Sequence, residues 1–342
     1  MNPALKPPGD ATEAAARPKV SILIPVYNSQ RFLAECLDSV LAQDFPEVEI
    51  LIADDGSTDA SLEIIQRYAA KDRRIRWWQN PRNLGQTRNH NACLEAARGE
   101  FIKFVHQDDK LLSASAIQKM VAALADNPAA KLAGSASEVI DDQSRLQERR
   151  ESFEGGVWDG KQIIVAGLEA TANRIGEPSV VMFRKADAGR GFLNDYQQLW
   201  DLEMWYHLLE QGDFVYLAEP LCAFRQHPAQ QTNVNRLAGI GPNEMLLLIE
   251  TYYARPWLRA IATQRMLINQ ARFLKKNRSK LSHRAELLRA EIKTQIKPAS
   301  YPIYWLERRV LRLQAKAKKV LAWLSKPRSQ SPAQTVLGAS NR

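Results

Sequence analysis

"EILIADDGSTD", residues 49 to 59, opens with a continuous apolar and β-branched run and ends abruptly in acidic and turn-forming residues. A strand with one face in water alternates apolar and polar side chains, whereas a strand covered on both faces is apolar throughout. The stretch therefore predicts a buried strand of a parallel sheet, followed by a turn. "VSILIPVYN" at residues 20 to 28 has the same form and predicts a second strand of this kind.

The segments between and after these strands have helical apolar spacing, so strands and helices alternate over the first hundred residues. In such a β-α-β series the connections are right-handed and helices cover both faces of the sheet. Gly99 is expected to end the third helix as the left-handed residue of its C-terminus. The sequence thus predicts an α/β fold with a Rossmann-like, mostly parallel, doubly wound sheet. The expected elements are helices at 29–42, 60–70 and 84–99 and strands at 74–80 and 100–105.

Acidic residues gather at the carboxyl ends of the predicted strands. Asp54 and Asp55 end one strand, and Asp108 and Asp109 end another. Ligands of open α/β sheets bind outside these strand ends, so the four carboxylates are expected at one edge. Mg²⁺ and Mn²⁺ take hard oxygen ligands, which Asp108 and Asp109 can supply. The alternative is a polar loop or a helix start, where the helix dipole favours acids.

The residues around Asp54 also allow two interpretations. A carboxylate here can accept a hydrogen bond from the imide N–H of uracil, which would make the turn a base-reading site. Asp-Gly and Ser-Thr-Asp are ordinary turn and cap sequences as well, and Pro25 and Tyr27 could simply end a strand. Each motif taken alone leaves both interpretations open.

Four motifs occur in order along the chain: "IPVYN", "DDGSTD", "NLGQTRN" and "GEFIKFVHQDD". Together they resemble the nucleotide-sugar-binding half of family 2 glycosyltransferases, whose fold is called GT-A. The resemblance covers roughly residues 19 to 230. It implies an inverting enzyme that moves a sugar from a nucleoside-diphosphate sugar, with uridine favoured, to an acceptor hydroxyl. It also implies a role in the synthesis of a cell-surface polysaccharide or glycolipid.

The resemblance assigns roles to residues that would contact the donor. Pro25 and Tyr27 would flank the nucleoside. Asp54, with Asp55 beside it, would read the base. Arg88 would lie beside the base and the diphosphate, the alternative being a solvated arginine on a helix.

The same resemblance implies a divalent cation, Mn²⁺ or Mg²⁺, that carries the diphosphate. Asp108 matches the ribose- or metal-facing position and Asp109 the metal ligand. In "FRQH", His227 becomes a candidate ligand of the metal or diphosphate, and Arg225 a neighbour of the phosphates. One departure is His106, which stands where many members carry an Asp; a metal ligand, a donor to phosphate and a plain strand-end residue are the alternatives.

Asp201 in "LWDLEMWYHLL" lies four residues before Trp205, as the Asp of the family's "ED-x-x-x-W" block does. The resemblance makes Asp201 the general base that takes the proton of the acceptor hydroxyl. Trp200 replaces the Glu that usually precedes this position, so Asp201 is expected to be more desolvated. Glu203 is the second candidate for the base, and Asp201 could also cap the helix beginning at Leu202.

Charge is divided unevenly along the chain. Residues 251–342 hold 21 lysines and arginines against 3 acidic residues, and residues 1–250 hold 26 against 35, so the net charges are about +18 and −9. Such a division indicates a catalytic body joined to a segment that seeks an anionic surface. The expected parts are a disordered lead at 1–18, a GT-A catalytic domain at 19–232, a basic helical region at 233–327 and a flexible tail at 328–342.

The basic region contains an apolar stripe at alternating three- and four-residue steps, surrounded by arginines and lysines. It could form a coiled coil between copies of the chain, dock on the body, or lie on an anionic membrane. The charge excess favours the membrane, and no nucleic-acid recognition motif accompanies it. The stripe consists of Ile303, Leu306, Val310, Leu313, Ala317, Val320 and Leu324.

Composition limits the compartment and the alternatives. Cys36, Cys93 and Cys222 show no metal-ligand or disulfide spacing, and no apolar run reaches the roughly 18 residues of a membrane span. A cytoplasmic protein, peripheral on the inner face of the plasma membrane, is expected, with a saccharide or lipid-linked saccharide acceptor and no nucleic acid. The alternatives are a sugar nucleotidyltransferase, which should carry a Gly-rich basic loop after its first strand, and a degenerate sugar-nucleotide-binding scaffold.

Overall fold

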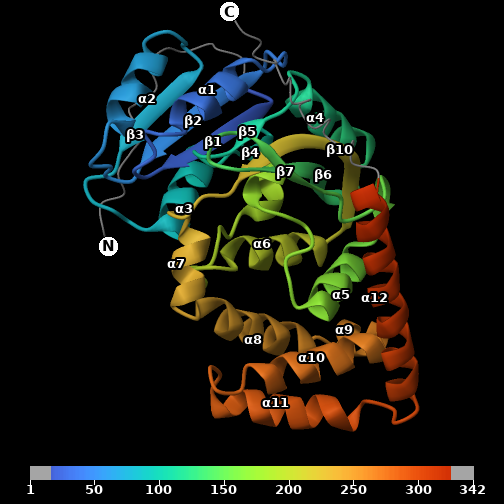
Figure 1. Ribbon diagram of the computed structural model, residues 1–342. Coiled ribbons are helices and arrows are strands. Elements are labelled where there is room, and N and C mark those ends of the chain that lie inside the picture. Colours follow the sequence, from blue (N-terminus) through green and yellow to red (C-terminus); the bar gives the residue numbers. More distant parts are fainter. Residues whose placement is uncertain (1–16, 325–342) are drawn as a thin grey trace, which may run out of the picture.

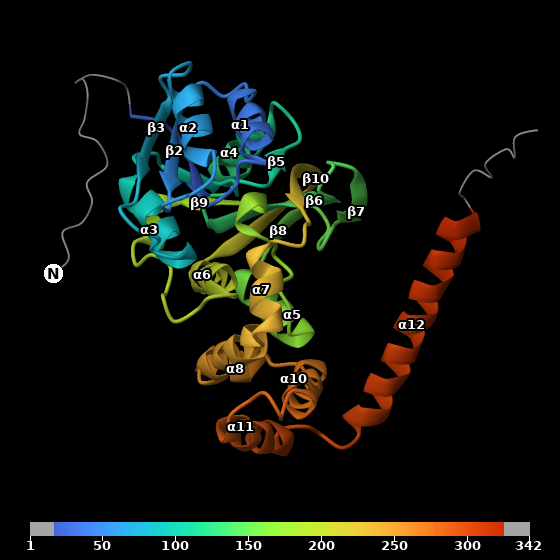
Figure 2. The ribbon, with the colours of Figure 1, turned by 60° about the vertical axis from the view of Figure 1, so that its left-hand side comes forward.

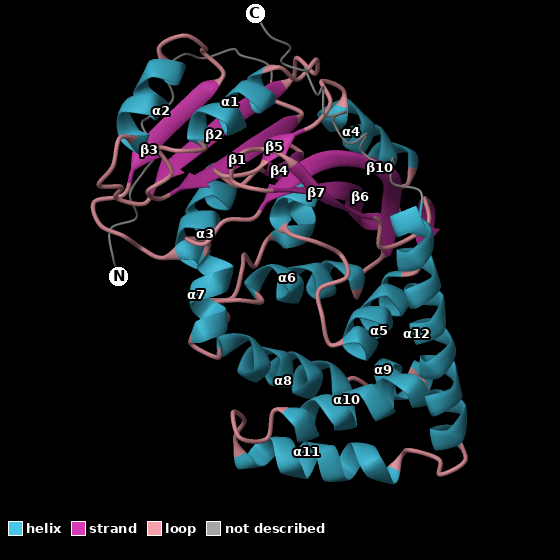
Figure 3. Ribbon diagram, in the orientation of Figure 1, coloured by secondary structure: helices cyan, strands magenta, loops and turns pink. Residues whose placement is uncertain are grey.

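The structure is a computed structural model that describes residues 17–324 (Figure 1). The predicted tail at 328–342 and all but the last two residues of the predicted lead lie outside this range. Strands and helices alternate over residues 20–104, and from residue 231 to residue 324 every element is a helix. Figure 3 shows the strands gathered at one end of the molecule and a layer of helices at the other. The fold is therefore the predicted α/β sheet with a helical C-terminal region.

Ten strands within the described residues form one sheet, of order β3-β2-β1-β4-β9-β6-β10-β5, with β7 beside β6 and β8 beside β10. The first four strands in this order are parallel, as predicted. Beyond them the sheet is mixed, because β9 runs antiparallel to both β4 and β6. The strands are β1 (Val20–Val26), β2 (Val48–Asp54), β3 (Ile75–Gln79), β4 (Phe101–Phe104), β5 (Lys110–Leu111), β6 (Ala130–Ile140), β7 (Leu146–Arg150), β8 (Gly156–Trp158), β9 (Val181–Arg184) and β10 (Asp213–Arg225).

Helices cover both faces of the sheet. Along β1, Ile22 and Ile24 belong to one hydrophobic core with α1, α2 and α4, whereas Leu23 belongs to the other core with α3, α5 and α6. Successive side chains of a strand point to opposite faces, so a strand covered twice must be apolar at every position, which explains the continuous runs. These helices are α1 (Leu33–Leu41), α2 (Ser61–Ala69), α3 (Gln86–Ala96), α4 (Ala116–Asp126), α5 (Gly160–Ala170) and α6 (Trp200–Leu209).

Gly99 has a different role from the one predicted. Helix α3 ends at Ala97, which is extended, and Gly99 is not in the left-handed region. A Cβ atom on Gly99 would lie 2.5 Å from the backbone nitrogen of Ser21. The glycine is required because the chain entering β4 passes against β1.

The first helices of the C-terminal region pack on the helices that lie beneath the sheet. Side chains of α8, α10 and α11 join the same hydrophobic core as α5 and α6, and the ring of Tyr252 lies 5.3 Å from that of Tyr206. The helical layer is therefore continuous with the core beneath the sheet. Its helices are α7 (Gln231–Leu237), α8 (Ile240–Tyr253), α9 (Pro256–Ile261), α10 (Gln264–Lys276), α11 (His283–Thr294) and α12 (Ser300–Leu324).

Helix α12 is attached mainly by its first turns and projects from the body (Figure 2). Tyr304 is buried and donates a hydrogen bond to Asn269 Oδ1 at 2.7 Å. In contrast, Ile303 and Leu306 of the predicted stripe are 60% and 65% exposed. The described part of the stripe is thus not docked on the body, and the side chains of Ala317, Val320 and Leu324 lie outside the described residues. Among the helices of residues 17–324, none combines the length and the apolar character that crossing a bilayer demands.

Candidate active site

The turns after β1, β2 and β4 are tied together at one edge of the sheet. Asn28 has a left-handed φ of 48°, a conformation that asparagine tolerates. Its Oδ1 accepts a hydrogen bond from the backbone N–H of Thr58 at 2.8 Å. Gln107 Oε1 accepts one from the N–H of Tyr27 at 2.5 Å, and Gln107 Nε2 returns one to the Tyr27 carbonyl at 3.2 Å. The predicted edge therefore exists, with the ring of Tyr27 45% exposed on it and Pro25 buried within β1.

The two carboxylates of "DDGSTD" have different surroundings. Both oxygens of Asp55 are occupied, because Oδ1 accepts from Asn80 Nδ2 and Leu84 N and Oδ2 accepts from Gly85 N. Asp54 is fully buried, and its Oδ2 accepts from Ser57 N at 3.0 Å. Asp54 Oδ1 has no hydrogen-bond partner among the described residues. Asp55 thus holds the loop before α3, whereas Asp54 keeps one oxygen unused.

Arg88 lies in the first turn of α3, and its side chain is exposed. Its guanidinium makes no hydrogen bond or ion pair with another residue in the 17–324 range. The structure therefore leaves this cation available to an anionic ligand, without locating one.

Asp109 and Asp108 lie side by side, and their pKa values shift in opposite directions. Burial raises the pKa of Asp109 well above its ordinary value, and the neighbouring charge of Asp108 adds to the effect. Burial also opposes ionisation of Asp108, but the hydrogen bond from His227, at 3.0 Å between Nε2 and Oδ2, lowers its pKa overall. Asp109 Oδ1 accepts from Arg225 N at 2.9 Å, while its buried Oδ2 lacks a partner in the described chain. Burial disfavours the ionised form of Asp109, and a cation beside it would stabilise that form.

His106 can complete a cation site with these two residues. His106, Asp108 and Asp109 each offer a ligand atom, and the three atoms lie within 4.8 Å of one another. His90 of α3 lies behind His106, with 3.1 Å between the two Nε2 atoms. Burial lowers the pKa of both histidines, that of His90 far below its ordinary value.

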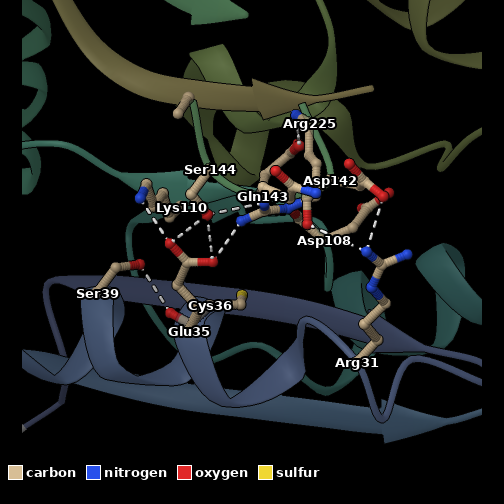
Figure 4. A network of polar contacts seen from close by, with 12 residues as sticks. Arg31, Glu35, Cys36, Ser39, Asp108, Lys110, Asp142, Gln143, Ser144 and Arg225 are labelled. Carbon is tan, nitrogen blue, oxygen red and sulfur yellow. Dashed lines mark hydrogen bonds and ion pairs between the residues drawn. The ribbon is translucent and has the colours of Figure 1, made fainter. Parts of the chain in front are cut away.

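Arg225 does not lie where the sequence interpretation put it. It is 1% exposed, and its guanidinium enters a polar network with Glu35 of α1 (Figure 4). Its Nε donates to the Asp108 carbonyl at 2.8 Å, and its Nη1 to the Asp141 carbonyl and to Ser144 Oγ at 3.0 and 2.9 Å. With its donors taken up in this way, Arg225 holds the loop that bears Asp108 and is not a phosphate neighbour.

Asp201 lies near the cation site on the facing helix α6. Burial raises its pKa to about 7, and the charge of Glu177 adds to the effect. The segment 173–179 reaches both places: Asn173 Nδ2 lies 3.4 Å from Asp201 Oδ2, and Ser179 Oγ accepts from the His106 N–H at 2.9 Å. The ring of Trp200 lies 4.3 Å from that of His90 and 6.4 Å from that of His106. The helix that carries Asp201 is thus packed directly on the cation site.

The second candidate for the base is occupied. Arg190 Nη2 donates to both oxygens of Glu203, at 2.9 and 2.8 Å. Asp201 is more loosely held: its Oδ1 accepts from Leu202 N at 2.7 Å, and its Oδ2 accepts from Asn173 Nδ2 at 3.4 Å. The helix begins at Trp200, so Asp201 stands within its first turn and is not its N-cap.

Several residues of this site carry no signal in the sequence. Glu35 lies in the first turn of α1, where acidic residues are common, and Glu177 lies in a connection without a clear pattern. His90 follows the "TRN" motif directly. It could have been found from the sequence by asking whether a second histidine can lie close to His106 at the end of the strand.

A sheet of this order, with acidic residues at the carboxyl edge of its parallel strands and a buried carboxyl group on the facing helix, has the architecture of a GT-A glycosyltransferase. Residues 21–187 match the model of glycosyl transferase family 2. An uncharacterized protein of Mycobacterium tuberculosis (strain CDC 1551 / Oshkosh) is 35% identical over 243 residues, which are 66% of this chain and 74% of that protein. The chain belongs to glycosyltransferase family 2 and is a glycosyltransferase.

Other relatives are more distant. TuaG of Bacillus subtilis, named a putative teichuronic acid biosynthesis glycosyltransferase, is 28% identical over 210 residues, 61% of this chain and 79% of TuaG. The crystal structure of S. aureus TarS residues 1–349 with UDP matches with a TM-score of 0.55 at 20% identity, covering 84% of this chain and 78% of that one. Further curated glycosyltransferases match over 90 to 97 residues, only 13% to 37% of their own length.

Proposed function

We propose that the protein is an inverting glycosyltransferase that moves a sugar from a uridine diphosphate sugar to a hydroxyl group of a saccharide or lipid-linked saccharide. One observation carries the proposal. Two buried carboxyl groups, Asp109 at the sheet edge and Asp201 on α6, are linked by the segment 173–179, because Asn173 contacts Asp201 and Ser179 contacts His106. One is suited to a cation and the other to a proton, as sugar transfer from a nucleoside diphosphate requires.

Recognition of uracil is assigned to Asp54. Its unused Oδ1 is an acceptor, and the imide N–H of uracil is a donor; cytosine offers a lone pair in the same place. A buried polar group left without a partner costs about 1–3 kcal/mol, so the site favours a base that donates here. The exposed ring of Tyr27 would lie against the face of the nucleoside, with Pro25 behind it, and Arg88 would approach the diphosphate.

The donor set fits a divalent cation. Asp109 presents a buried oxygen without a partner, and Asp108 presents a carboxylate whose pKa is lowered. Carboxylate oxygens suit Mg²⁺ and Mn²⁺. We place His227 beside this group as a partner of the diphosphate, since its Nε2 contacts Asp108. When bound, the cation would offset the negative charge that develops on the departing nucleoside diphosphate.

Asp201 supplies the acid–base chemistry. Its carboxylate accepts the proton of the acceptor hydroxyl while that oxygen bonds to the anomeric carbon and the bond from that carbon to the phosphate oxygen breaks. Attack from the side opposite the leaving group inverts the anomeric centre. A base with a pKa of about 7 is both ionised and basic near neutral pH, which general-base catalysis favours.

The kind of acceptor is inferred from helix α12. Its exposed apolar stripe and arginines suit the headgroup region of an anionic membrane, and TuaG is named for the synthesis of a cell-wall polymer. The proposal places the enzyme on the cytoplasmic face of the plasma membrane, acting on a cell-surface polysaccharide or glycolipid precursor. A homo-oligomer joined through the same stripe is the alternative use of α12.

The proposal is tested by nucleoside diphosphate release. The protein is incubated with Mn²⁺, saccharide and lipid-linked acceptors, and uridine, guanosine and thymidine diphosphate sugars. We expect release of UDP from one uridine donor, and its loss in Asp109→Asn. Release of pyrophosphate in place of a nucleoside diphosphate would indicate a nucleotidyltransferase. Binding of a donor without turnover would indicate the scaffold.

A further inference from the structure

Two histidines form a chain from α3 to the cation site. His90 Nδ1 lies 2.7 Å from the carbonyl oxygen of Gln86, and its Nε2 lies 3.1 Å from Nε2 of His106. His90 is 3% exposed, and the ring of Trp200 packs on it at 4.3 Å. The position of this ring is therefore fixed from two sides.

The hydrogen bonds determine which nitrogen of each ring carries a proton. A carbonyl oxygen only accepts, so His90 Nδ1 is protonated. His90 is buried without a carboxylate partner, so the ring is neutral and its Nε2 is an acceptor. His106 Nε2 must then be the donor in the contact between the rings. In neutral His106 the remaining nitrogen, Nδ1, carries a lone pair, and no residue of the described chain donates a hydrogen bond to it.

The main chain of His106 is held as well. Its backbone N–H donates to Ser179 Oγ at 2.9 Å, and its carbonyl accepts from Asp109 N at 2.9 Å. The backbone that carries the ring is thus fixed beside Asp108 and Asp109, with which His106 can share a ligand centre.

We propose that His106 is a nitrogen ligand of the divalent cation, bound through Nδ1 in the tautomer that His90 imposes. His90 is a positioning residue. A metal-bound histidine commonly donates a hydrogen bond from its other ring nitrogen to a fixed partner, and this bond sets the tautomer. The inference rests on the cation site of the proposed function. It gives a common role to two histidines: His106, which stands where many family members carry an Asp, and His90, which follows "TRN".

The consequence is a change of metal preference. Mg²⁺ is a hard ion that takes oxygen ligands, whereas imidazole binds d-block ions more strongly in the order Mn²⁺, Fe²⁺, Co²⁺. A site with one nitrogen and two carboxylates should therefore prefer Mn²⁺ or Co²⁺ to Mg²⁺ more strongly than a site made of carboxylates alone.

The test uses the full chain and Mn²⁺, with and without UDP. Mn²⁺ affinity is measured by electron paramagnetic resonance, Mg²⁺ affinity by competition, and direct nitrogen ligation by ¹⁴N pulsed electron–nuclear double resonance. We expect nitrogen coupling in the natural protein and its loss in His106→Asp, together with a fall of about tenfold or more in the ratio of Mn²⁺ to Mg²⁺ affinity. His90→Phe keeps the ring volume but removes the acceptor; we expect it to weaken Mn²⁺ binding by about 10- to 100-fold.

His283→Gln is the matched control, since this histidine of α11 is 79% exposed and should change neither measurement. Mn²⁺ binding that depends on Asp109 but shows no nitrogen coupling would overturn the inference and leave the cation site standing. Absence of Mn²⁺ binding with and without UDP would overturn both. Sugar transfer is judged separately, by UDP release in saturating Mn²⁺ and its loss in excess chelator, so its failure is distinguishable from that of the inference.

Discussion

At the scale of single residues, the site depends on two carboxyl groups that burial affects in the same direction. The pKa of Asp109 is raised far, and that of Asp201 is raised to about 7. Asp109 is adjacent to a second carboxylate and a histidine, so a cation can restore its ionised form. Asp201 has only the amide of Asn173 and a backbone N–H as partners, so it can exchange a proton. Position decides which carboxyl group binds and which acts as the base.

Asp201→Asn tests the base directly. Asparagine keeps the size and the backbone contact of the side chain but cannot take a proton. We expect kcat to fall by about 10²- to 10⁴-fold, with little change in KM for the donor. Glu203→Gln is the control: because Arg190 already occupies that carboxylate, its loss should cost much less. Equal losses of kcat in both variants would contradict the assignment.

The pH dependence of kcat follows from the raised pKa of Asp201. The carboxyl group is protonated and inactive below its pKa of about 7, and it becomes the active base above it. The rate should therefore rise as pH increases through about 7 and then level off. Initial rates from pH 5.5 to 9 at saturating donor and metal measure this. A rate that stays flat between pH 5.5 and 8 would show that Asp201 does not limit the reaction.

The sequence predicted residue types at the site better than it predicted side-chain directions. Asp54, Asp109 and Asp201 could be named because they end strands or belong to a motif. Arg225 was placed beside the phosphates, yet its side chain points into the network with Glu35. Adjacent residues of a strand end point to opposite sides, and a sequence motif does not record to which side a long side chain turns.

At the scale of elements, Arg225 joins four pieces of the chain: the end of β10, helix α1, the turn between β6 and β7, and the loop after β4. A buried guanidinium without its partners is costly, so Arg225→Met should destabilise the protein by about 3–5 kcal/mol. Arg31→Met is the control from the same network (Figure 4), since Arg31 is 58% exposed and its pair with Asp142 should contribute only about 0–1 kcal/mol.

Urea denaturation of the two variants measures this difference. Arg225→Met should also weaken Mn²⁺ binding, because the guanidinium that it removes holds the Asp108 carbonyl. Similar free energies of unfolding for the two variants would show that the buried network is not what fixes the loop.

Gly99 offers a second test at this scale. A Cβ at Gly99 would meet backbone atoms of β1 at 2.5 Å, so Gly99→Ala must push β4 and β1 apart. We expect a loss of about 1–3 kcal/mol of unfolding free energy, the usual cost of overpacking. Gly189→Ala is matched to it, because Gly189 is in a helical conformation with nothing within 4 Å of a Cβ. A stability at or above that of the natural protein is expected there.

The existence of the main strands could be predicted from the sequence, whereas the direction of β9 could not. The apolar runs of β1, β2 and β4 gave the parallel part of the sheet, because a doubly covered strand has a distinctive pattern. Strand β9 is only four residues long and lies between β4 and β6, so its antiparallel direction depends on packing that no local pattern encodes.

At the scale of the whole molecule, charge and packing divide the chain at different places. The basic segment begins near residue 251, yet α8, α10 and α11 share a core with the catalytic body. Among the helices of residues 17–324, only α12 combines an excess of basic residues with an apolar stripe that the body leaves exposed. The surface proposed to meet a membrane is therefore one helix and not the entire basic region.

Two variants of α12 separate charge from apolar contact. Leu306 and Val310 are 65% and 44% exposed on the stripe, and Arg309 and Arg312 are exposed beside it. If α12 lies on an anionic bilayer, Arg309→Gln with Arg312→Gln should weaken binding by about 2 kcal/mol, about 1 kcal/mol for each charge. Leu306→Ser with Val310→Ser should weaken it at all salt concentrations, because burial of apolar area is not screened. Co-sedimentation with phosphatidylglycerol vesicles measures both effects.

The double variant Lys276→Gln with Arg278→Gln removes the same charge from exposed positions at the end of α10. It should leave vesicle binding nearly intact if α12 is the helix that contacts the membrane. Pure phosphatidylcholine vesicles should bind the natural protein weakly, since they lack the anionic headgroups. A coiled coil between copies makes the opposite prediction: the serine variant would change the mass measured by light scattering, while neither α12 variant would change vesicle binding. A monomer that binds anionic vesicles equally well in all three variants would remove α12 from both interpretations.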